Sequence, residues 1–379
     1  MKHLVLAGAG HAHAQVLQQW AIHPVPGVCV TVVSPEPLAP YSGMVPGWLA
    51  GTYRFDDIVI DFEALCARAG ARWIPTELDR LEPDQQTLYL ANGEALAYDA
   101  VSLNVGSTLR PPVLSGAGSR VIALRPLSKL RSRYEDFLYS WTAEGSDSPV
   151  TVTAVGGGAA GVESLLAVLH RLRQARPDRQ VHGVLISRST MLLPGFAPAA
   201  CRAALNALTR AGVVLQLGST WRADSQRKSE LVLWATGAQA QDWQLDPLRR
   251  NHLSVSDDGF VRVDAQLRSI SHPQVFAVGD CAHWEATSQT IPKAGVYAVR
   301  MGPVLSHNLR AALTGGRPMT AYAPQRRYLA LLGTADGRAI ASRGGLGASG
   351  AWAWHLKDHI DRRFIRRFAP GAQIQDDSG

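Results

Sequence analysis

The segment Lys2-His-Leu-Val-Leu-Ala-Gly-Ala-Gly-His-Ala-His-Ala14 decides the fold of this chain. An apolar, strand-like run reaches a glycine turn and continues into a helical stretch ending near Trp20, and Val28–Val33 follows as a second β-branched strand. Strand, glycine turn, helix and strand in this order are typical of a dinucleotide-binding unit. Gly8 permits the tight turn and Gly10 the close approach of the backbone to a pyrophosphate. The amides at the start of the helix, near His11, would point at that pyrophosphate.

Two positions depart from the usual pattern of this unit. His13 stands where a third glycine is usual, and Ser34 where an acidic residue normally follows the second strand. Glu36 lies two positions further on and is the candidate substitute for that acid.

The same layout occurs a second time, about 148 residues later, in Val150-Thr-Val-Thr-Ala-Val-Gly-Gly-Gly-Ala-Ala-Gly-Val-Glu-Ser164. This copy has all three glycines, Gly156, Gly158 and Gly161, then a helix to about Leu172 and the strand Val181–Ser187. Two such units predict two nucleotide sites, and the alternative for each is a tight strand–helix turn without a ligand.

Further paired segments support a duplicated plan. Tyr98–Ser107 and Glu230–Gly237 are short apolar strands that end at a glycine, and each follows its own unit. Gly259–Asp264 then precedes Gln274–Asp280, an apolar strand that ends in Gly-Asp.

The composition is that of a globular chain with a large core. The 379 residues are 46% hydrophobic and 18% charged, which excludes a disordered chain, a coiled coil and a small disulfide-stapled module. No apolar run reaches the roughly 18–20 residues of a membrane span, and Met1 leads directly into the first strand. We therefore expect a cytoplasmic protein, either soluble or bound at the inner face of a membrane.

The cysteines and charges narrow the classes of partner. The four cysteines, Cys29, Cys66, Cys201 and Cys281, lack metal-ligand spacing, so we expect no metal site. A net charge of +7 suits an anionic partner. The basic residues lie in no recognised nucleic-acid-reading motif, and nucleic acid is not an expected partner.

Four motifs in order carry a resemblance to a known family. The turns at 8–13 and 156–161, Ala235-Thr-Gly237 and Val278-Gly-Asp280 resemble those of two-dinucleotide-binding-domain flavoproteins. These form the pyridine nucleotide-disulfide oxidoreductase superfamily, and the chain is most similar to its type II NADH dehydrogenase-like branch. Residues 40–46 and 291–300 are also similar to flavoprotein domains fused to selenide water dikinase.

The resemblance covers roughly residues 1–335 and implies an α/β fold with two Rossmann-like domains. A discontinuous FAD-binding domain (1–113 and 250–330) would be interrupted by an NAD(P)H-binding domain (114–249). A C-terminal region (331–379) would follow.

By the same resemblance, the first unit would hold FAD noncovalently. Ser34 and Glu36 would lie near the adenosine ribose, Leu78 near the adenine and Asp280 at the ribityl chain. Lys293 and the helix that starts near Ala294 would stabilise the reduced flavin. The expected FAD-binding residues are Gly8, Gly10, His11, Ala12, His13, Ser34, Glu36, Tyr41, Ser42, Gly43, Met44, Leu78, Asn104, Gly106, Gly279, Asp280, Lys293 and Ala294.

The second unit would hold NADH or NADPH. The expected residues are Gly156, Gly158, Gly161, Glu163, Ser187, Arg188 and Gly237. Ser187-Arg188 replaces the acid that bonds a ribose 2′-hydroxyl and could accept a 2′-phosphate, so NADPH is allowed. Glu163 would lie near the nicotinamide and, with Lys293, is an expected catalytic residue.

The family comparison also suggests the electron route. Disulfide reductases carry redox cysteines in the segment that here reads Tyr41-Ser-Gly-Met-Val-Pro46, and Ser42 stands where peroxidase-like members keep one cysteine. Electrons would then pass from NAD(P)H through FAD directly to an acceptor, for which a quinone is the leading candidate. The alternatives are a reductase of selenium or sulfur species and a flavoprotein whose redox state controls partner binding.

Residues 351–368 form the clearest partner signal. Apolar side chains recur at 352, 356, 360, 364 and 368, and the other positions include Lys357, Arg362, Arg363, Arg366 and Arg367. This predicts an amphipathic helix that lies in a membrane interface. The alternatives are packing on its own domain or on a second subunit in a homodimer.

Overall fold

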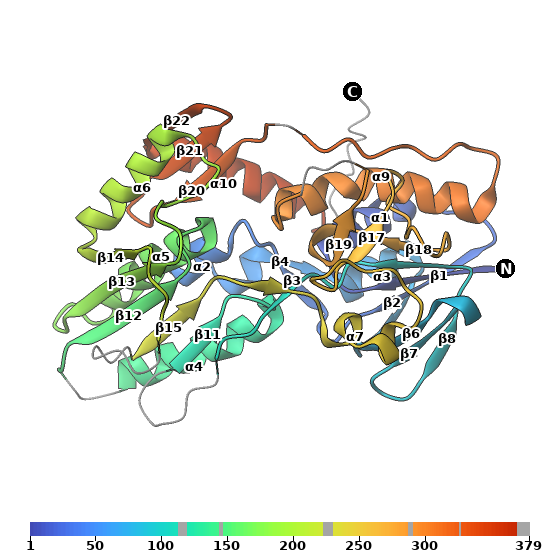
Figure 1. The fold of residues 1–379 in the computed structure, drawn as a ribbon, viewed down its shortest axis with the longest axis horizontal. Coiled ribbons are helices and arrows are strands. Elements are labelled where there is room, and N and C mark those ends of the chain that lie inside the picture. Colours follow the sequence, from blue (N-terminus) through green and yellow to red (C-terminus); the bar gives the residue numbers. More distant parts are fainter. Residues whose placement is uncertain (113–119, 144–146, 223–229, 287–290, 326, 370–379) are drawn as a thin grey trace.

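The computed structural model describes residues 1–112, 120–143, 147–222, 230–286, 291–325 and 327–369, and it contains two five-stranded parallel sheets (Figure 1). The first has the order β18 (Val275–Ala277), β9 (Ala100–Leu103), β1 (Lys2–Ala7), β2 (Val28–Val33) and β5 (Arg72–Ile74). The second has the order β11 (Arg120–Ala123), β15 (Leu231–Trp234), β12 (Val150–Val155), β13 (Val181–Ser187) and β14 (Val213–Leu217). The predicted α/β fold with two Rossmann-like units is confirmed.

Alternating side chains of β1 bury both faces of the first sheet. Leu4 and Leu6 pack in the core with α1 (His11–Ile22), α3 (Phe62–Ala69) and α9 (Gly295–Thr314). Val5 and Ala7 point into the core on the opposite face, beside the antiparallel strands β6 (Leu78–Glu82), β7 (Thr87–Leu90) and β8 (Ala95–Ala97). A strand buried on both sides reads as a continuous apolar run, which is why β1 was recognisable in the sequence.

The second sheet packs with α4 (Leu127–Ala143), α5 (Ala159–Ala175) and α6 (Pro198–Arg210). A short helix from the first half of the chain, α2 (Val45–Leu49), joins this core through Met44, Val45 and Leu49. The segment that follows β3 (Leu38–Pro40) therefore crosses from one sheet to the other. Its residues 41–44 lie where the two halves meet.

The C-terminal region forms an antiparallel sheet and a helix. β20 (Ala330–Gly333), β21 (Ala339–Arg343) and β22 (Leu346–Gly350) lie beside α6, and α10 (Ala351–Arg366) runs from them toward the first half (Figure 1). None of the helices in the described ranges combines the length and apolar character needed to cross a bilayer.

The apolar side chains expected to form a stripe along residues 351–368 do not lie on a single face of the helix. Trp352 and Ile360 are 54% and 42% exposed, whereas Phe364 and Phe368 are buried in the core of the first half. Residues spaced four apart advance about 40° per step on a helix of 3.6 residues per turn, so the two ends of the stripe point in nearly opposite directions. Lys357, expected on the charged face, is buried instead. The helix itself ends at Arg366, two residues before the predicted end.

The described residues also form several shorter elements. They are β4 (Val59–Asp61), β10 (Thr108–Leu109), β16 (Ala238–Gln239), α7 (Asp242–Leu245), α8 (Pro247–Arg250), β17 (Val261–Val263) and β19 (Ala282–Trp284). In the sequence, four strands of the first sheet (β1, β2, β5 and β9) precede all strands of the second sheet, and the fifth, β18, follows them. The predicted domain boundary at 113–114 lies outside the described residues, and those at 249–250 and 330–331 stay predictions.

Candidate cofactor and active site

The turn between β1 and α1 is built around Asn104. The Asn104 side chain accepts a hydrogen bond from the Ala12 amide (3.2 Å) and donates one to the Val278 carbonyl (3.0 Å). A Cβ on Gly10 would lie 2.0 Å from the Asn104 Oδ1, and one on Gly8, where φ is +100°, would lie 2.5 Å from the Asn104 carbonyl. In this structure, Gly8 and Gly10 are therefore required by the close approach of a neighbouring strand end.

His13 also holds this turn together. Its ring nitrogens lie 2.7 Å from the Gly8 carbonyl and 2.8 Å from the Ser102 hydroxyl, and the side chain is fully buried. Burial lowers the pKa of His13 to about 4, so the ring is neutral and can donate to one partner and accept from the other. The histidine in place of the third glycine thus joins the turn to β9.

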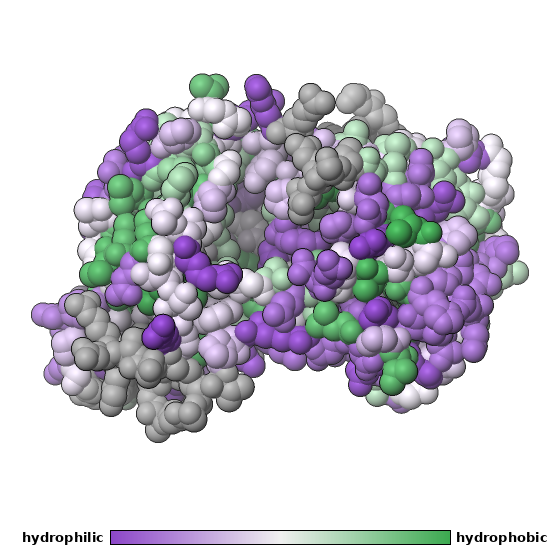
Figure 2. Space-filling model, in the orientation of Figure 1, coloured by the Kyte–Doolittle hydropathy of each residue, from purple (hydrophilic) through white to green (hydrophobic). Residues whose placement is uncertain are grey.

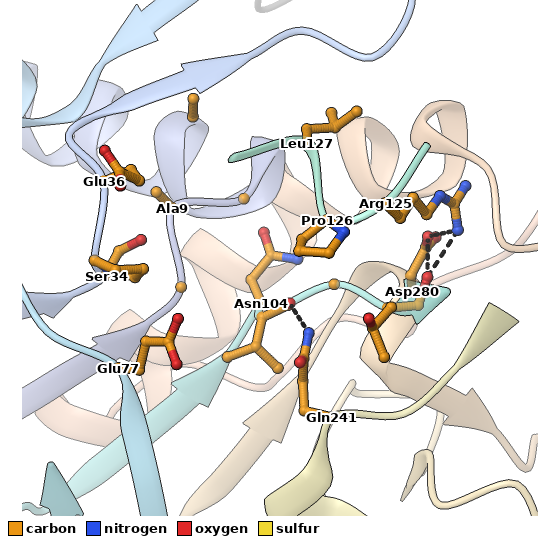
Figure 3. Close-up of a pocket in the computed structure, with 18 of the residues that line it drawn as sticks. Ala9, Ser34, Glu36, Glu77, Asn104, Arg125, Pro126, Leu127, Gln241 and Asp280 are labelled. Atoms are coloured by element: carbon orange, nitrogen blue, oxygen red, sulfur yellow. Dashed lines mark hydrogen bonds and ion pairs between the residues drawn. The ribbon is translucent and has the colours of Figure 1, made fainter. Parts of the chain in front are cut away.

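A cavity of about 600 Å³, here called the first cavity, runs past this turn (Figure 3). Gly10 and His11 line this cavity, so the positive end of α1 faces it, although Asn104 Oδ1 already accepts a hydrogen bond from the Ala12 amide there. Ser34 and Glu36 lie toward one end, and Asp280 lies at the other (Figure 3). The predicted residues that line the first cavity are Gly8, Gly10, His11, Ser34, Glu36, Ser42, Leu78, Asn104, Gly106 and Asp280. Ala12, His13, Met44 and Gly279 do not line it.

Several lining residues were missed in the sequence, Glu77 and Arg125 among them. Glu77 lies beside Ser34 and Glu36 (Figure 3), and its only sequence signal is its place before Leu78. Arg125 follows β11 in the second half of the molecule, yet its guanidinium donates to Ser107 (2.7 Å), to Asp280 (2.5 Å) and to the Lys293 carbonyl (3.0 Å). No local pattern could indicate a contact across 155 residues of chain.

Lys293 is held away from this network. Its ammonium donates to the Ala282 carbonyl (2.6 Å) and lies 3.7 Å from the centre of the Phe260 ring. Burial lowers the pKa of Lys293 to about 8, while the negative charge of Asp280 opposes this shift.

A larger cavity of about 1190 Å³, the second cavity, lies along the second glycine turn. A Cβ on Gly158 would meet nothing within 4 Å, so the backbone is open to a ligand there, whereas a Cβ on Gly161 would lie 1.9 Å from the Gly156 carbonyl. Arg188 is exposed and lines this cavity beside the buried Ser187. The predicted residues along it are Tyr41, Ser42, Gly43, Gly156, Gly158, Glu163, Ser187, Arg188, Gly237, Lys293 and Ala294. Gly161 does not line it.

Glu163 is a buried carboxyl in the wall of the second cavity. Its Oε1 accepts a hydrogen bond from the Gly333 amide of β20 (2.7 Å). Burial raises the pKa of Glu163 to about 7, against the opposing effects of the Lys357 charge and of this hydrogen bond. The side chain can therefore hold or release a proton near neutral pH.

The two cavities adjoin one another. Figure 2 shows the surface hollowed between the two halves of the molecule. The residues that line both cavities are Ser42, Arg110, Arg125, Leu127 and Gly295. Ligands in the two cavities would meet at this junction.

The cysteines lie away from both cavities. All four cysteines are among the described residues, none lines either cavity, and each is a free thiol. Burial raises the pKa of Cys66 to about 12 and that of Cys281 to about 11. In the described part of the chain, no three histidine, cysteine or acidic side chains are grouped to hold a metal ion.

Known proteins share this sequence pattern. The family model for pyridine nucleotide-disulphide oxidoreductases matches residues 2–302. Demethylphylloquinone reductase NdbB of Synechocystis sp. is 28% identical over 315 residues, which cover 76% of this chain and 73% of that protein. The alternative NAD(P)H-ubiquinone oxidoreductase C1 of Arabidopsis thaliana, a chloroplastic and mitochondrial protein, is 27% identical over 265 residues. The match covers 62% of this chain but only 49%, about half, of that relative.

A solved structure also shares the fold. The sulfide:quinone oxidoreductase of Aquifex aeolicus superposes with a TM-score of 0.78 at 16% sequence identity, over 100% of this chain and 93% of that one. At this identity the likeness concerns the fold alone.

Proposed function

The chain belongs to the pyridine nucleotide-disulphide oxidoreductase family, and we propose that it oxidises NAD(P)H through noncovalently bound FAD and passes the electrons to a quinone-type acceptor. The observation that carries this proposal is the junction of the two cavities at Ser42, Arg110, Arg125, Leu127 and Gly295. A flavin at the end of the first cavity would meet a nicotinamide in the second. Membership of an oxidoreductase family agrees with the predicted enzyme class and cofactors.

The first cavity has the chemistry that FAD requires. The start of α1 suits a pyrophosphate because its positive dipole end faces the cavity at Gly10 and His11. Glu36 and Glu77 beside Ser34 can accept hydrogen bonds from ribose hydroxyls. Asp280 can do the same for a ribityl chain, once Arg125 shares or releases its carboxylate. His11, Gly106 and Leu78 complete the proposed FAD site.

The second cavity suits the nicotinamide dinucleotide. Gly158 leaves room for a pyrophosphate at the start of α5, and Gly156 and Gly237 line the same wall. The exposed Arg188 can pair with a 2′-phosphate, and Ser187 adds no negative charge that would repel it. We therefore propose that NADPH is preferred over NADH.

FAD would supply the chemistry, and the protein would position FAD and place charged groups beside it. FAD, when bound, supplies a two-electron carrier between a hydride donor and an acceptor. Arg125 would hold positive charge at the junction of the cavities, where a reduced flavin gains negative charge. We propose that Lys293 contributes at longer range because its ammonium is held by the Ala282 carbonyl.

Apolar side chains in the lining of the second cavity favour an apolar acceptor. Val296, Val299, Leu329, Ile360 and Phe364 line it together with residues 41–43, and the Phe364 ring packs against Tyr41. These side chains suit a quinone ring and its tail, whereas a selenium or sulfur oxyanion would need more hydrogen-bond donors. The quinone is accordingly our proposal for the acceptor.

Exposed apolar side chains toward the C-terminal end of the chain support a proposal of peripheral membrane binding. Leu329, Leu346, Trp352 and Ile360 are exposed, with Arg363 and Arg366 exposed on the same helix. We propose that this surface rests on an anionic bilayer. Trp352→Ser/Ile360→Ser should then lose cosedimentation with phosphatidylglycerol vesicles, whereas concentration-dependent dimerisation that these changes abolish would assign the surface to a second copy of the chain.

Anaerobic mixing tests the central proposal. NADPH should bleach the flavin band at about 450 nm, and a soluble quinone analogue should restore it. The matched control is Gly158→Val, whose side chain would fill the open backbone cradle. This variant should keep its FAD, bleach with dithionite and respond poorly to NADPH. A yellow protein that neither nucleotide reduces would refute the dehydrogenase, and reoxidation by selenium or sulfur oxyanions alone would replace the acceptor.

A further inference from the structure

His11 is the first residue of α1, and its ring contacts residues of both cavities. The side chain is half-buried and lines the first cavity. Its Nε2 accepts a hydrogen bond from the Ser42 amide (3.5 Å), and Ser42 lines both cavities. The ring also lies edge-on to Tyr41, with 5.4 Å between ring centres, and 6.2 Å from the Phe364 ring. Tyr41 and Phe364 line the second cavity. The imidazole therefore lies beside the junction at which we place the flavin.

The His11 ring is neutral and can still accept a proton. Because Nε2 accepts the Ser42 amide, the hydrogen of the neutral ring is on Nδ1. Within the described ranges, the ring makes no other hydrogen bond. Burial lowers the pKa of His11 to about 4, and the negative charge of Asp280 opposes this shift. A second negative charge nearby would favour a proton on Nε2, at the cost of one long hydrogen bond.

The other charged groups around this ring are already paired. The Asp280 carboxylate is bound by the Arg125 guanidinium. On the side of α10, the Tyr41 hydroxyl donates a hydrogen bond to Asp361, and the Lys357 ammonium donates another to the same carboxylate (2.7 Å). The opposite charges of each pair largely cancel. The imidazole is a neutral group at this place that can gain a charge.

We propose that His11 binds one proton from water when FAD in the first cavity is reduced, and releases it when the electrons leave. This inference rests on the proposed function, which places FAD there. A hydride from NAD(P)H carries two electrons and one proton, so its arrival adds one negative charge at the junction. A new N–H bond at Nε2 makes His11 an imidazolium and balances that charge.

The return step is balanced in the same way. A quinone takes two electrons and two protons to become a quinol. One of the protons comes with the electrons as a hydride equivalent, and the other comes from water. With the negative charge gone, the imidazolium returns its proton to water, and Nε2 again accepts the Ser42 amide.

The redox potential of the bound flavin measures this proton. Each proton bound with the two electrons lowers the midpoint potential by about 30 mV for every tenfold fall in proton activity. With one proton on the flavin and one on His11, the wild type should show a slope of about 60 mV per pH unit between about pH 5 and about pH 7. His11→Gln keeps an oxygen for the Ser42 amide but takes up no proton, so its slope should be about 30 mV.

The experiment is a potentiometric titration of the FAD-loaded full chain with dithionite and redox mediators. It uses neither NAD(P)H nor a quinone, so it is independent of the proposed donor and acceptor. A second measurement counts protons with a pH indicator in weakly buffered solution at about pH 6. When NADPH bleaches the flavin, the wild type should take up about one proton per flavin and His11→Gln almost none.

The matched control is His355→Gln. His355 is exposed on α10 and lines neither cavity. This variant should keep both the slope and the proton count of the wild type. A change in it equal to that in His11→Gln would assign the effect to histidine titration in general and overturn the proposal.

The remaining outcomes also decide. A wild-type slope of about 30 mV throughout would overturn the proposal, as would equal slopes in the wild type and His11→Gln. If His11→Gln loses its flavin, the absorption spectrum of the reduced wild type decides instead. An anionic spectrum with the steep slope places the proton on the protein, whereas the spectrum of the neutral reduced form would place it on the flavin and overturn the inference.

Failure of the proposed function would look different. A yellow protein with the steep slope that NADPH does not bleach would refute the proposed electron donor and leave the role of His11 intact. A protein that binds no FAD would refute the proposed function and this inference together.

Discussion

Replacing Glu163 by glutamine should change how the stability of the protein depends on pH. The carboxyl is buried, and its pKa is raised from 4.5 to about 7 mainly by that burial. A raised pKa in the folded state means that the folded protein keeps a proton that the unfolded chain releases. The stabilisation is therefore complete below the unfolded pKa and is lost as the pH rises through the folded value. Glutamine keeps an oxygen for the Gly333 amide but cannot ionise.

The pKa shift sets the size of the effect. Between about pH 5 and about pH 8.5, a shift of this size costs the wild-type protein about 2–3 kcal/mol of unfolding free energy, and about 1 kcal/mol has already been lost at the lower pH. The Glu163→Gln variant does not lose this unfolding free energy, because glutamine does not ionise. Because all other groups titrate alike in both proteins, the difference between their stabilities isolates Glu163.

Urea unfolding at both pH values, with and without FAD, measures this difference. At about pH 5 the variant should be the more stable by only about 1 kcal/mol, because the folded wild-type carboxyl is protonated and resembles the amide while the unfolded one is mostly ionised. At about pH 8.5 the variant should be the more stable by about 3 kcal/mol. Parallel stability curves would refute the reasoning, because they would mean that Glu163 ionises as freely in the folded protein as in the unfolded chain.

Three further changes test the cofactor sites. Gly10→Ala would place a Cβ 2.0 Å from Asn104 Oδ1. It should therefore lower the unfolding free energy by about 1–3 kcal/mol and reduce the FAD content of the purified protein. Unchanged flavin absorbance would contradict the proposed place of this turn in the FAD site. His13→Ala removes the hydrogen bonds of the ring with the Ser102 hydroxyl and the Gly8 carbonyl. It should lower the free energy of unfolding, measured in urea, by about 2–4 kcal/mol. The flavin spectrum should persist in this variant, and its loss would instead place His13 in the cofactor site. Arg188→Leu should raise the KM for NADPH about tenfold and leave that for NADH unchanged, and an equal change for both would exclude 2′-phosphate recognition.

The sequence predicted those parts of the protein that depend on interactions between residues close together in the chain. Buried parallel strands are continuous apolar runs, and β1, β2, β12 and β13 could be read as such. The glycine turns were visible because tight strand–helix connections need residues without a Cβ. Gly158 and Arg188, predicted to face a ligand from their place within a few residues of a strand end, both line the second cavity.

Tertiary structure alone decided which distant side chains share a cavity. Arg125 meets Asp280 across 155 residues of chain, and Lys357 meets Gly43 across 314. Hydrophobic periodicity placed Lys357 on the exposed face of α10, because a stripe of residues spaced four apart winds around the helix and leaves open which arc will be buried. That choice depends on the partner surface, which for α10 includes β20, β21 and residues 41–43. Burial there, and not the identity of the residue, raises the pKa of Glu163 to about 7.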